Sequence, residues 1–231
     1  MSSSNPRRLA LCGLLFVLLD LIALFLPGPP PKANDSAVHI AGTLAAHRSQ
    51  LMAGTYIAGL ALVALVFFLG ALRSWLETTR SDPGLVRAAC AGALLGLAVQ
   101  VVGLLLFYGA TFRVAGQHQD ALVRALTDGG NAAVELSKFG FAAFIAGICL
   151  AARRQLINRF IALGWVSMAL LMISAIALVS ETALTQFGGG LDVVGSAPGV
   201  LWIAVLSVMA FRGGAAREIS TGLAAPARGM T

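Results

Sequence analysis

Glu135 and Lys138 are the residues whose chemistry most needs an explanation. They lie three positions apart in a segment, 132–152, that holds no other charged residue. Residues three apart share one face of a helix, so the carboxylate and the ammonium can form an ion pair there. Ionisable groups at membrane depth are costly, and helical bundles usually keep them inward and partnered. The pair therefore marks where a binding or proton-carrying site would lie.

Asp20 is the next candidate for the same site. It lies six residues before Leu26, the expected outer end of the first apolar helix, and hence roughly 9 Å below the outer surface. Lys138 lies seven residues past Asn131, at roughly 10 Å by the same helical rise. From the matching depths we draw the hypothesis of one buried cluster of Asp20, Glu135 and Lys138. In the alternative, Asp20 bonds a hydroxyl inside the bundle, while Lys138 pairs with Glu135 alone or extends its ammonium outward.

Gln100 is a polar residue near the middle of another apolar segment, 88–107. It could line a pathway for a solute, or it could bond a neighbouring helix, and the second interpretation is favoured. The same segment opens with Gly92-Ala-Leu-Leu-Gly96. This spacing of glycines predicts a close contact between two helices.

Catalytic and metal-binding patterns do not accompany these residues. The sequence has no Gly-x-Ser-x-Gly, His-Glu-x-x-His, Cys-x-x-Cys or phosphate loop. The three histidines are expected in the outer loops, and the three cysteines near the inner ends of their helices. They are His39, His47, His118, Cys12, Cys90 and Cys149. We therefore expect a protein that is not an enzyme and that takes no cofactor or metal.

The elements that hold these residues are apolar segments long enough to cross a bilayer. The chain has 231 residues, of which 58% are apolar and only 11% are charged. This composition is typical of an all-α polytopic membrane protein. Six transmembrane helices are predicted, within one domain at 1–212, at residues 9–26, 51–72, 88–107, 132–152, 160–180 and 197–211. The alanine- and glycine-rich tail at 213–231 is expected to be a disordered cytoplasmic segment.

The basic residues predict the orientation of these helices. With the N-terminus inside, most arginines fall in cytoplasmic segments. They are Arg7, Arg8, Arg73, Arg80, Arg87, Arg153, Arg154, Arg159, Arg212, Arg217 and Arg228. The opposite side holds only Lys32, Arg48, Arg113 and Arg124. The positive-inside rule then places both termini in the cytoplasm and the protein in the cell membrane. Because the net charge of +6 is divided among loops rather than gathered in one patch, nucleic acid is not an expected partner.

The first outer loop supplies a further pattern. Asn34-Asp35-Ser36 suits the cap of a short helix that precedes the second span. This helix ends in His47-Arg48 and is followed by Leu51-Met-Ala-Gly-Thr-Tyr-Ile-Ala-Gly-Leu and Phe68-Leu-Gly-Ala-Leu-Arg73. The pattern, strongest over residues 9–75, resembles a group of actinobacterial six-span membrane proteins of unknown function. The resemblance implies the six-span topology and supplies no catalytic residue.

Two functions fit these observations. The protein is expected to be an accessory or structural subunit of a membrane assembly, with the lipid bilayer and a partner membrane protein or a second copy as its contacts. The alternative is a carrier or binder of a small or lipidic solute, with a polar cluster near the outer ends of helices 1 and 4. The two differ in whether Glu135 and Lys138 face a cavity or a buried seam between helices.

Overall fold

The computed structural model describes residues 6–28, 31, 35–79, 81–153, 156–178 and 190–223, and these form helices without any strand. In chain order the helices are α1 (Pro6–Ala10), α2 (Cys12–Phe25), α3 (Ala37–Ala46), α4 (Arg48–Thr78), α5 (Pro83–Gly109), the π-helix η1 (Ala110–Val114), α6 (Asp120–Ala151), α7 (Asn158–Ser174), the 3-10 helix η2 (Ala175–Leu178) and α8 (Gly190–Leu223). The predicted all-helical class is confirmed.

Five of the helical segments are long and apolar enough to cross a membrane. They are Arg8–Phe25, Arg48–Thr78, Pro83–Val114, Asp120–Ala151 and Asp192–Arg212. The protein is therefore membrane-embedded, as its composition predicted. The sixth predicted span, 160–180, corresponds to α7, which is apolar but has only 17 residues.

The ends of the helices differ from the predicted ones. Helix α6 begins at Asp120, 12 residues before the expected start of the span at residue 132. Gly130 lies inside this helix and packs against Phe107 of α5, where a Cβ would lie 3.1 Å from the ring. Helix α8 runs to Leu223, so residues 213–223 are helical rather than disordered as expected, and residues 224–231 lie outside the described part.

Side-chain caps begin two of the helices. Ser36 caps α3, as predicted, and its Oγ accepts a hydrogen bond of 3.2 Å from the backbone N–H of His39. Asp82 caps α5, and its Oδ1 accepts from the N–H groups of Gly84 and Leu85 at 2.8 and 3.2 Å. Such caps satisfy donors that have no partner within the helix.

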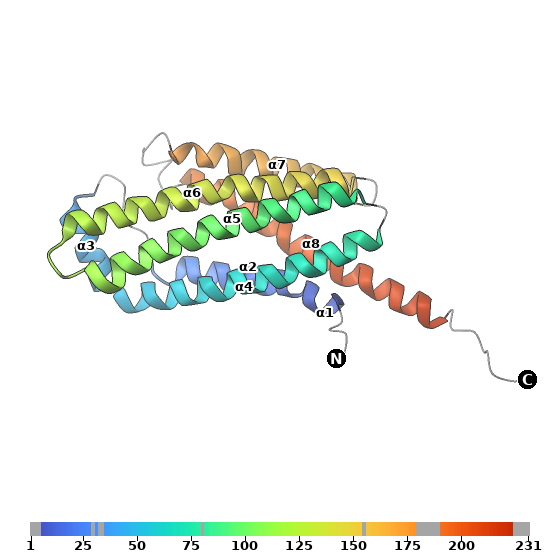
Figure 1. The fold of residues 1–231 in the computed structure, drawn as a ribbon, viewed down its shortest axis with the longest axis horizontal. Helices are drawn as coiled ribbons and strands as arrows, with labels where there is room; N and C mark the ends of the chain where they lie inside the picture. The colour runs from blue at the N-terminus through green and yellow to red at the C-terminus, as the bar shows by residue number, and fades with distance from the viewer. Residues whose placement is uncertain are drawn as a thin grey trace, which may run out of the picture.

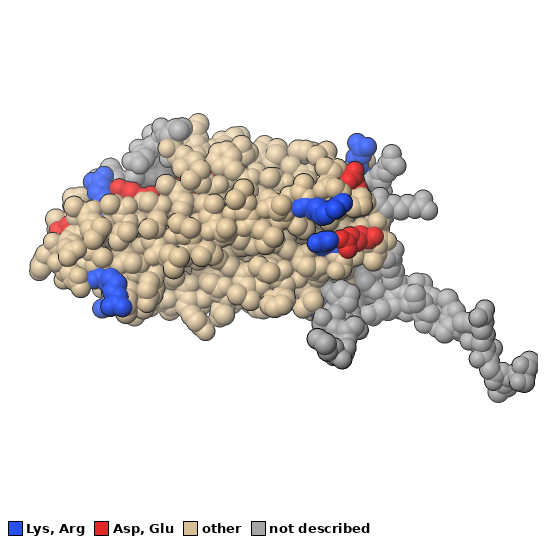
Figure 2. Space-filling view, in the orientation of Figure 1, with Lys and Arg blue, Asp and Glu red and all other residues tan. Residues whose placement is uncertain are grey.

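The long helices form three antiparallel pairs, α2 with α4, α5 with α6, and α7 with α8 (Figure 1). Helix α7 also packs against α6, and α8 packs against α2 and α4, so α8 joins the pairs into one bundle. The start of α1 and the end of α8 lie at the same end of the bundle (Figure 1). Ser207 of α8 donates a hydrogen bond to the backbone oxygen of Ala10 in α1 at that end. Charged side chains gather at the two ends, and an uncharged band separates them on the visible face (Figure 2).

Glycines bring α5 and α6 into close contact. A Cβ on Gly140 of α6 would lie 2.5 Å from the backbone nitrogen of Gly96 and 2.7 Å from the backbone oxygen of Gly92. A Cβ on Gly147 would lie 2.7 Å from the Cβ of Ala89. The Gly92-x-x-x-Gly96 pattern thus marks a real helix contact, as predicted. The backbone of α6, and with it Glu135 and Lys138, is held against α5.

Trp202 of α8 fills the centre of the largest apolar core. It is fully buried, stacks on Phe160 of α7 with ring centroids 5.2 Å apart, and meets Phe144 of α6 edge-on at 6.0 Å. Its Nε1 donates a hydrogen bond of 3.3 Å to the backbone oxygen of Phe160. The core therefore fixes α6, α7 and α8 relative to one another, and these are the helices that surround the candidate site.

Candidate functional site

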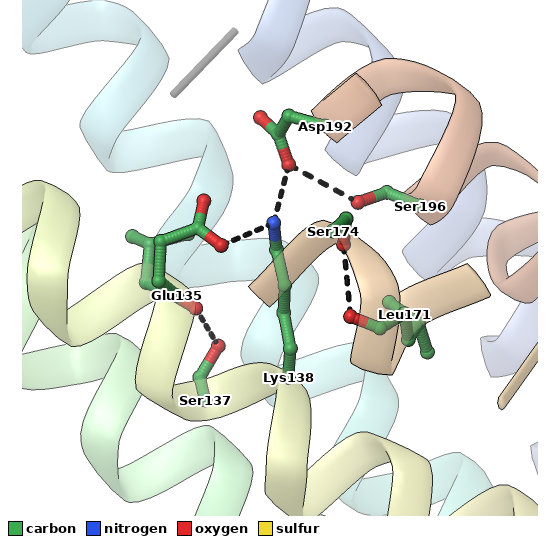
Figure 3. Close-up of polar contacts among 8 residues, drawn as sticks. Glu135, Ser137, Lys138, Leu171, Ser174, Asp192 and Ser196 are labelled. Carbon is green, nitrogen blue, oxygen red and sulfur yellow. Dashed lines mark hydrogen bonds and ion pairs between the residues drawn. The ribbon is translucent and has the colours of Figure 1, made fainter. Parts of the chain in front are cut away.

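Three buried charged residues meet between α6 and α8. The ammonium of Lys138 donates a hydrogen bond of 2.6 Å to Oε2 of Glu135 and another of 2.6 Å to Oδ1 of Asp192 (Figure 3). Glu135, Lys138 and Asp192 are exposed by only 3%, 4% and 8%. We call these three residues the charge cluster. The predicted pair of Glu135 and Lys138 is confirmed, and Asp192 is a third member.

Each member of the charge cluster lies within a helix, two on α6 and one on α8. Glu135 and Lys138 are one turn apart on the same face of α6. Asp192 lies in the first turn of α8, where a carboxylate is favoured by the partial positive charge of the helix N-terminus. Ser196, one turn further along α8, lies 3.4 Å by its Oγ from Oδ1 of Asp192. The ion pair of Lys138 with Asp192 therefore connects two helices far apart in sequence.

The nearby hydroxyl groups bond their own helices. Ser137 donates to the backbone oxygen of Val134 at 2.7 Å, and Ser174 donates to that of Leu171 at 2.9 Å (Figure 3). Both serines are buried. Each hydroxyl has a single proton and donates it to a backbone carbonyl. Neither serine therefore donates to the carboxylates of the charge cluster.

Two buried oxygen atoms beside this network have no hydrogen-bond partner among the described residues. They are Oε1 of Glu135 and Oδ1 of Asn131, one turn earlier on α6. A buried acceptor without a donor costs roughly 1–3 kcal/mol, more for a charged group. The ammonium of Lys138 therefore has hydrogen-bond partners, whereas the oxygen atoms on the side of Asn131 lack a donor.

Asp20 is not among the ion-pair partners of Lys138, so the hypothesis of a contact between them is not met. Its depth in the membrane was the basis of that prediction, but depth does not determine which helices are neighbours. Asp20 lies on the face of α2 that carries Gly13 and Phe16, and α2 packs mainly against α4 and α8. Asp192 occupies the role assigned to Asp20. An acid two residues after Gly190 could have indicated it, but the predicted span at 197–211 did not include Asp192.

Gln100 lies outside the charge cluster. It is partly buried on α5, between the close-packed Gly96 and Gly103, and its side chain forms no hydrogen bond with another described residue. The favoured prediction of a hydrogen bond between helices is therefore not met in the described part of the chain. The side chain also contacts none of the cluster's polar atoms.

Two surface hollows lie away from the charge cluster. One, of about 440 Å³, lies between the first half of α4 and the end of α5 and is mainly apolar. It is lined by Met52, Thr55, Tyr56, Gly59, Leu60, Val63 and Tyr108. The other, of about 490 Å³, lies along α3. No member of the charge cluster lines either hollow; all three are buried between α6 and α8.

Metal-ligating residues do not gather elsewhere in the described part of the chain. No three His, Cys, Asp or Glu side chains among the described residues are close enough to hold a metal ion. Cys12, Cys90 and Cys149 are free thiols on three different helices.

Comparisons of the chain with protein-family models, with curated proteins and with solved structures found no match. The fold and the charge cluster are therefore the observations from which we infer a function.

Proposed function

We propose that the protein is a non-catalytic accessory or structural subunit of a membrane assembly. The observation that carries this proposal is the burial of the charge cluster between α6 and α8, with each member at most 8% exposed. A buried ion network between two helices fixes their register and rotation, which a docking subunit needs. No solute has to reach the cluster for it to serve this purpose.

The proposed topology has six crossings. Helix α7 has 17 residues and η2 adds 4, so together they extend for roughly 33 Å. This length suffices for a hydrocarbon core of about 30 Å. With α7 as a crossing, α1 and the end of α8 lie on one side of the membrane, together with the arginine-rich connections after α4 and α6. The positive-inside rule places this side in the cytoplasm and supports the cell membrane as the location. The resemblance to actinobacterial six-span proteins agrees with this topology.

The partners in this proposal contact the outward faces of the helices. Large apolar side chains there are strongly exposed, among them Tyr56 at 70% and Val63 at 54% on α4, and Leu95 at 63% and Leu105 at 62% on α5. Lipid covers such faces in the absence of a partner. A partner membrane protein or a second copy of the chain would replace part of that lipid.

A second candidate function is a carrier or binder of a small solute. The observation that favours it is the pair of unpartnered acceptors, Oε1 of Glu135 and Oδ1 of Asn131. A donor group on a solute would satisfy both atoms. This function requires an opening to the outer end of α6, whereas the accessory function does not.

Native mass spectrometry of the tagged full chain, extracted gently from its own membranes, distinguishes the two functions. A second protein in stoichiometric amount is expected for an accessory subunit. The control is an unrelated tagged membrane protein from the same membranes, which should not carry that second protein. A monomer or homo-oligomer that retains lipid or small-molecule mass would replace the accessory function with the carrier function.

A further inference from the structure

We propose that the charge cluster is a binding site for one exchangeable proton, which is carried by Glu135 on Oε1. This proposal does not depend on the accessory function, because a structural subunit and a carrier can both hold a proton in such a site.

The charges of the cluster do not balance without a proton. Two carboxylates, Glu135 and Asp192, surround one ammonium, Lys138, within hydrogen-bond distance and almost out of reach of water. Ionised together they would leave one net negative charge in the interior of a membrane bundle, which is unfavourable. One bound proton makes the cluster neutral. It leaves the ion pair of Lys138 with Asp192 intact.

Among the described residues, the other charged groups near α6 do not supply the missing positive charge. From residue 88 to residue 109, α5 carries no charged residue, and α7 carries none from 160 to 174. The segment 179–189 contains no lysine, arginine or histidine. Arg124 is paired with Asp128 at the outer end of α6, and Arg113 of η1 and His39 of α3 are exposed there. On α2, Asp20 is another acid and would add only negative charge.

The two unpartnered oxygen atoms indicate where the proton is bound. Oε2 of Glu135 already accepts from Lys138, whereas Oε1 has no partner, and neither has Oδ1 of Asn131. Because Asn131 and Glu135 are four residues apart on one helix, their side chains are neighbours. A proton on Oε1 turns this oxygen into a donor toward Oδ1 of Asn131. A single O–H bond thus satisfies both buried acceptors.

A row of polar residues connects this position with the outer end of the bundle. Asp128, Asn131 and Glu135 follow one another at spacings of three and four along one face of α6. Asp128 is exposed, Asn131 is partly buried and Glu135 is buried. The proton comes from a hydronium ion at the outer surface. An O–H bond forms on Glu135, one breaks in the hydronium ion, and water is left.

Infrared difference spectroscopy of the full chain in lipid nanodiscs tests this proposal. The wild-type protein at neutral pH is expected to show the C=O stretching band of a protonated carboxylic acid. The band should shift in D2O, since the proton exchanges. It should be lost in Glu135→Gln and retained in the matched control Asp20→Asn, which also removes one buried acid.

Two further measurements keep the test decisive. Asn131→Leu leaves the acid in place but removes its acceptor, so the band should move to higher frequency; this readout does not need a stable Glu135→Gln protein. Identical spectra for the wild type and Glu135→Gln would overturn the proposal. Carboxylate bands that respond to sodium chloride but not to choline chloride would overturn it as well, because they would show a metal cation in the site. The presence or absence of a stoichiometric partner changes none of these bands.

Discussion

Lys138 donates hydrogen bonds to acids on two helices, so its loss deprives Asp192 of its ammonium partner and Glu135 of its donor. Lys138→Met is expected to lower the free energy of unfolding by about 3–5 kcal/mol, the usual effect of breaking a buried ion pair. The double variant Lys138→Met/Glu135→Gln also replaces the acid that lost its donor and should lose less stability than the single variant. Denaturant unfolding in one detergent measures the three stabilities.

The effects of substituting Lys138 and Glu135 on stability are expected to be coupled. If Lys138 and Glu135 act as a pair, their two substitutions are not additive. A double variant as unstable as the sum of the two single variants would contradict the pairing. Adding Asp192→Asn to the double variant removes the remaining acid of the charge cluster and should restore further stability.

Asp192 and Asp20 are expected to differ in how much they contribute to the free energy of unfolding. Asp192→Asn removes one charge-assisted hydrogen bond to Lys138, and the free energy of unfolding should fall by about 1–3 kcal/mol. Asp20→Asn removes no ion pair found among the described residues and should not lower this free energy. Melting temperatures in the same detergent show which of the two variants is destabilised. A larger loss in Asp20→Asn than in Asp192→Asn would show that Asp20 is the structural partner.

The sequence predicts the local half of the charge cluster and misses the distant half. The pairing of Glu135 with Lys138 follows from a spacing of three on one helix, which any helical structure preserves. The contact of Lys138 with Asp192 depends on how α8 is placed against α6 and α7. That placement comes from side-chain packing around Trp202, which no spacing in the sequence encodes.

At the scale of helices, the contact of α5 with α6 depends on Gly140. A Cβ there would lie 2.5 and 2.6 Å from backbone atoms of Gly96, which cannot rotate away. Gly140→Ala is therefore expected to lower the free energy of unfolding by about 1–3 kcal/mol. The matched control is Gly70→Ala on α4, where a Cβ would meet no atom within 4 Å. Unfolding experiments on both variants should show a loss in the first alone.

The two glycine variants also separate packing from helix propensity. Alanine favours a helix over glycine by up to about 1 kcal/mol, so Gly70→Ala should be neutral or slightly stabilising. Equal effects of the two substitutions would mean that the close contact of α5 with α6 is not formed in the membrane.

The sequence predicts the apolar part of each helix better than its ends. Hydropathy reports the length that lipid requires, about 20 residues, whereas α4, α6 and α8 have 31, 32 and 34. The additional turns are held by contacts outside the apolar runs. One is Gly130 against Phe107, and another is the cluster of Ile40 and Leu44 of α3 with Val123 of α6.

At the scale of the whole molecule, the proposed topology predicts which positions face the outside. Single cysteines are placed at Gln119, Asn158 and Ser180 in a chain whose three native cysteines are replaced by alanine. A membrane-impermeant maleimide on intact cells should label the cysteines at positions 119 and 180. The cysteine at position 158 should react only after the cells are permeabilised. Labelling at 119 without labelling at 180 would show that α7 does not cross the membrane.

The position of Glu135 on the same helix as Lys138 also has a consequence for biosynthesis. The ribosome makes α6 before α8, and Asp192 follows Lys138 by 54 residues. An unpaired lysine near the centre of a nascent helix costs about 2.5–3.5 kcal/mol when the translocon releases the helix into lipid. Glu135 accompanies Lys138 from the start and reduces this cost. Asp192 is made later, and we expect it to pair with the buried ammonium when α8 packs against α6.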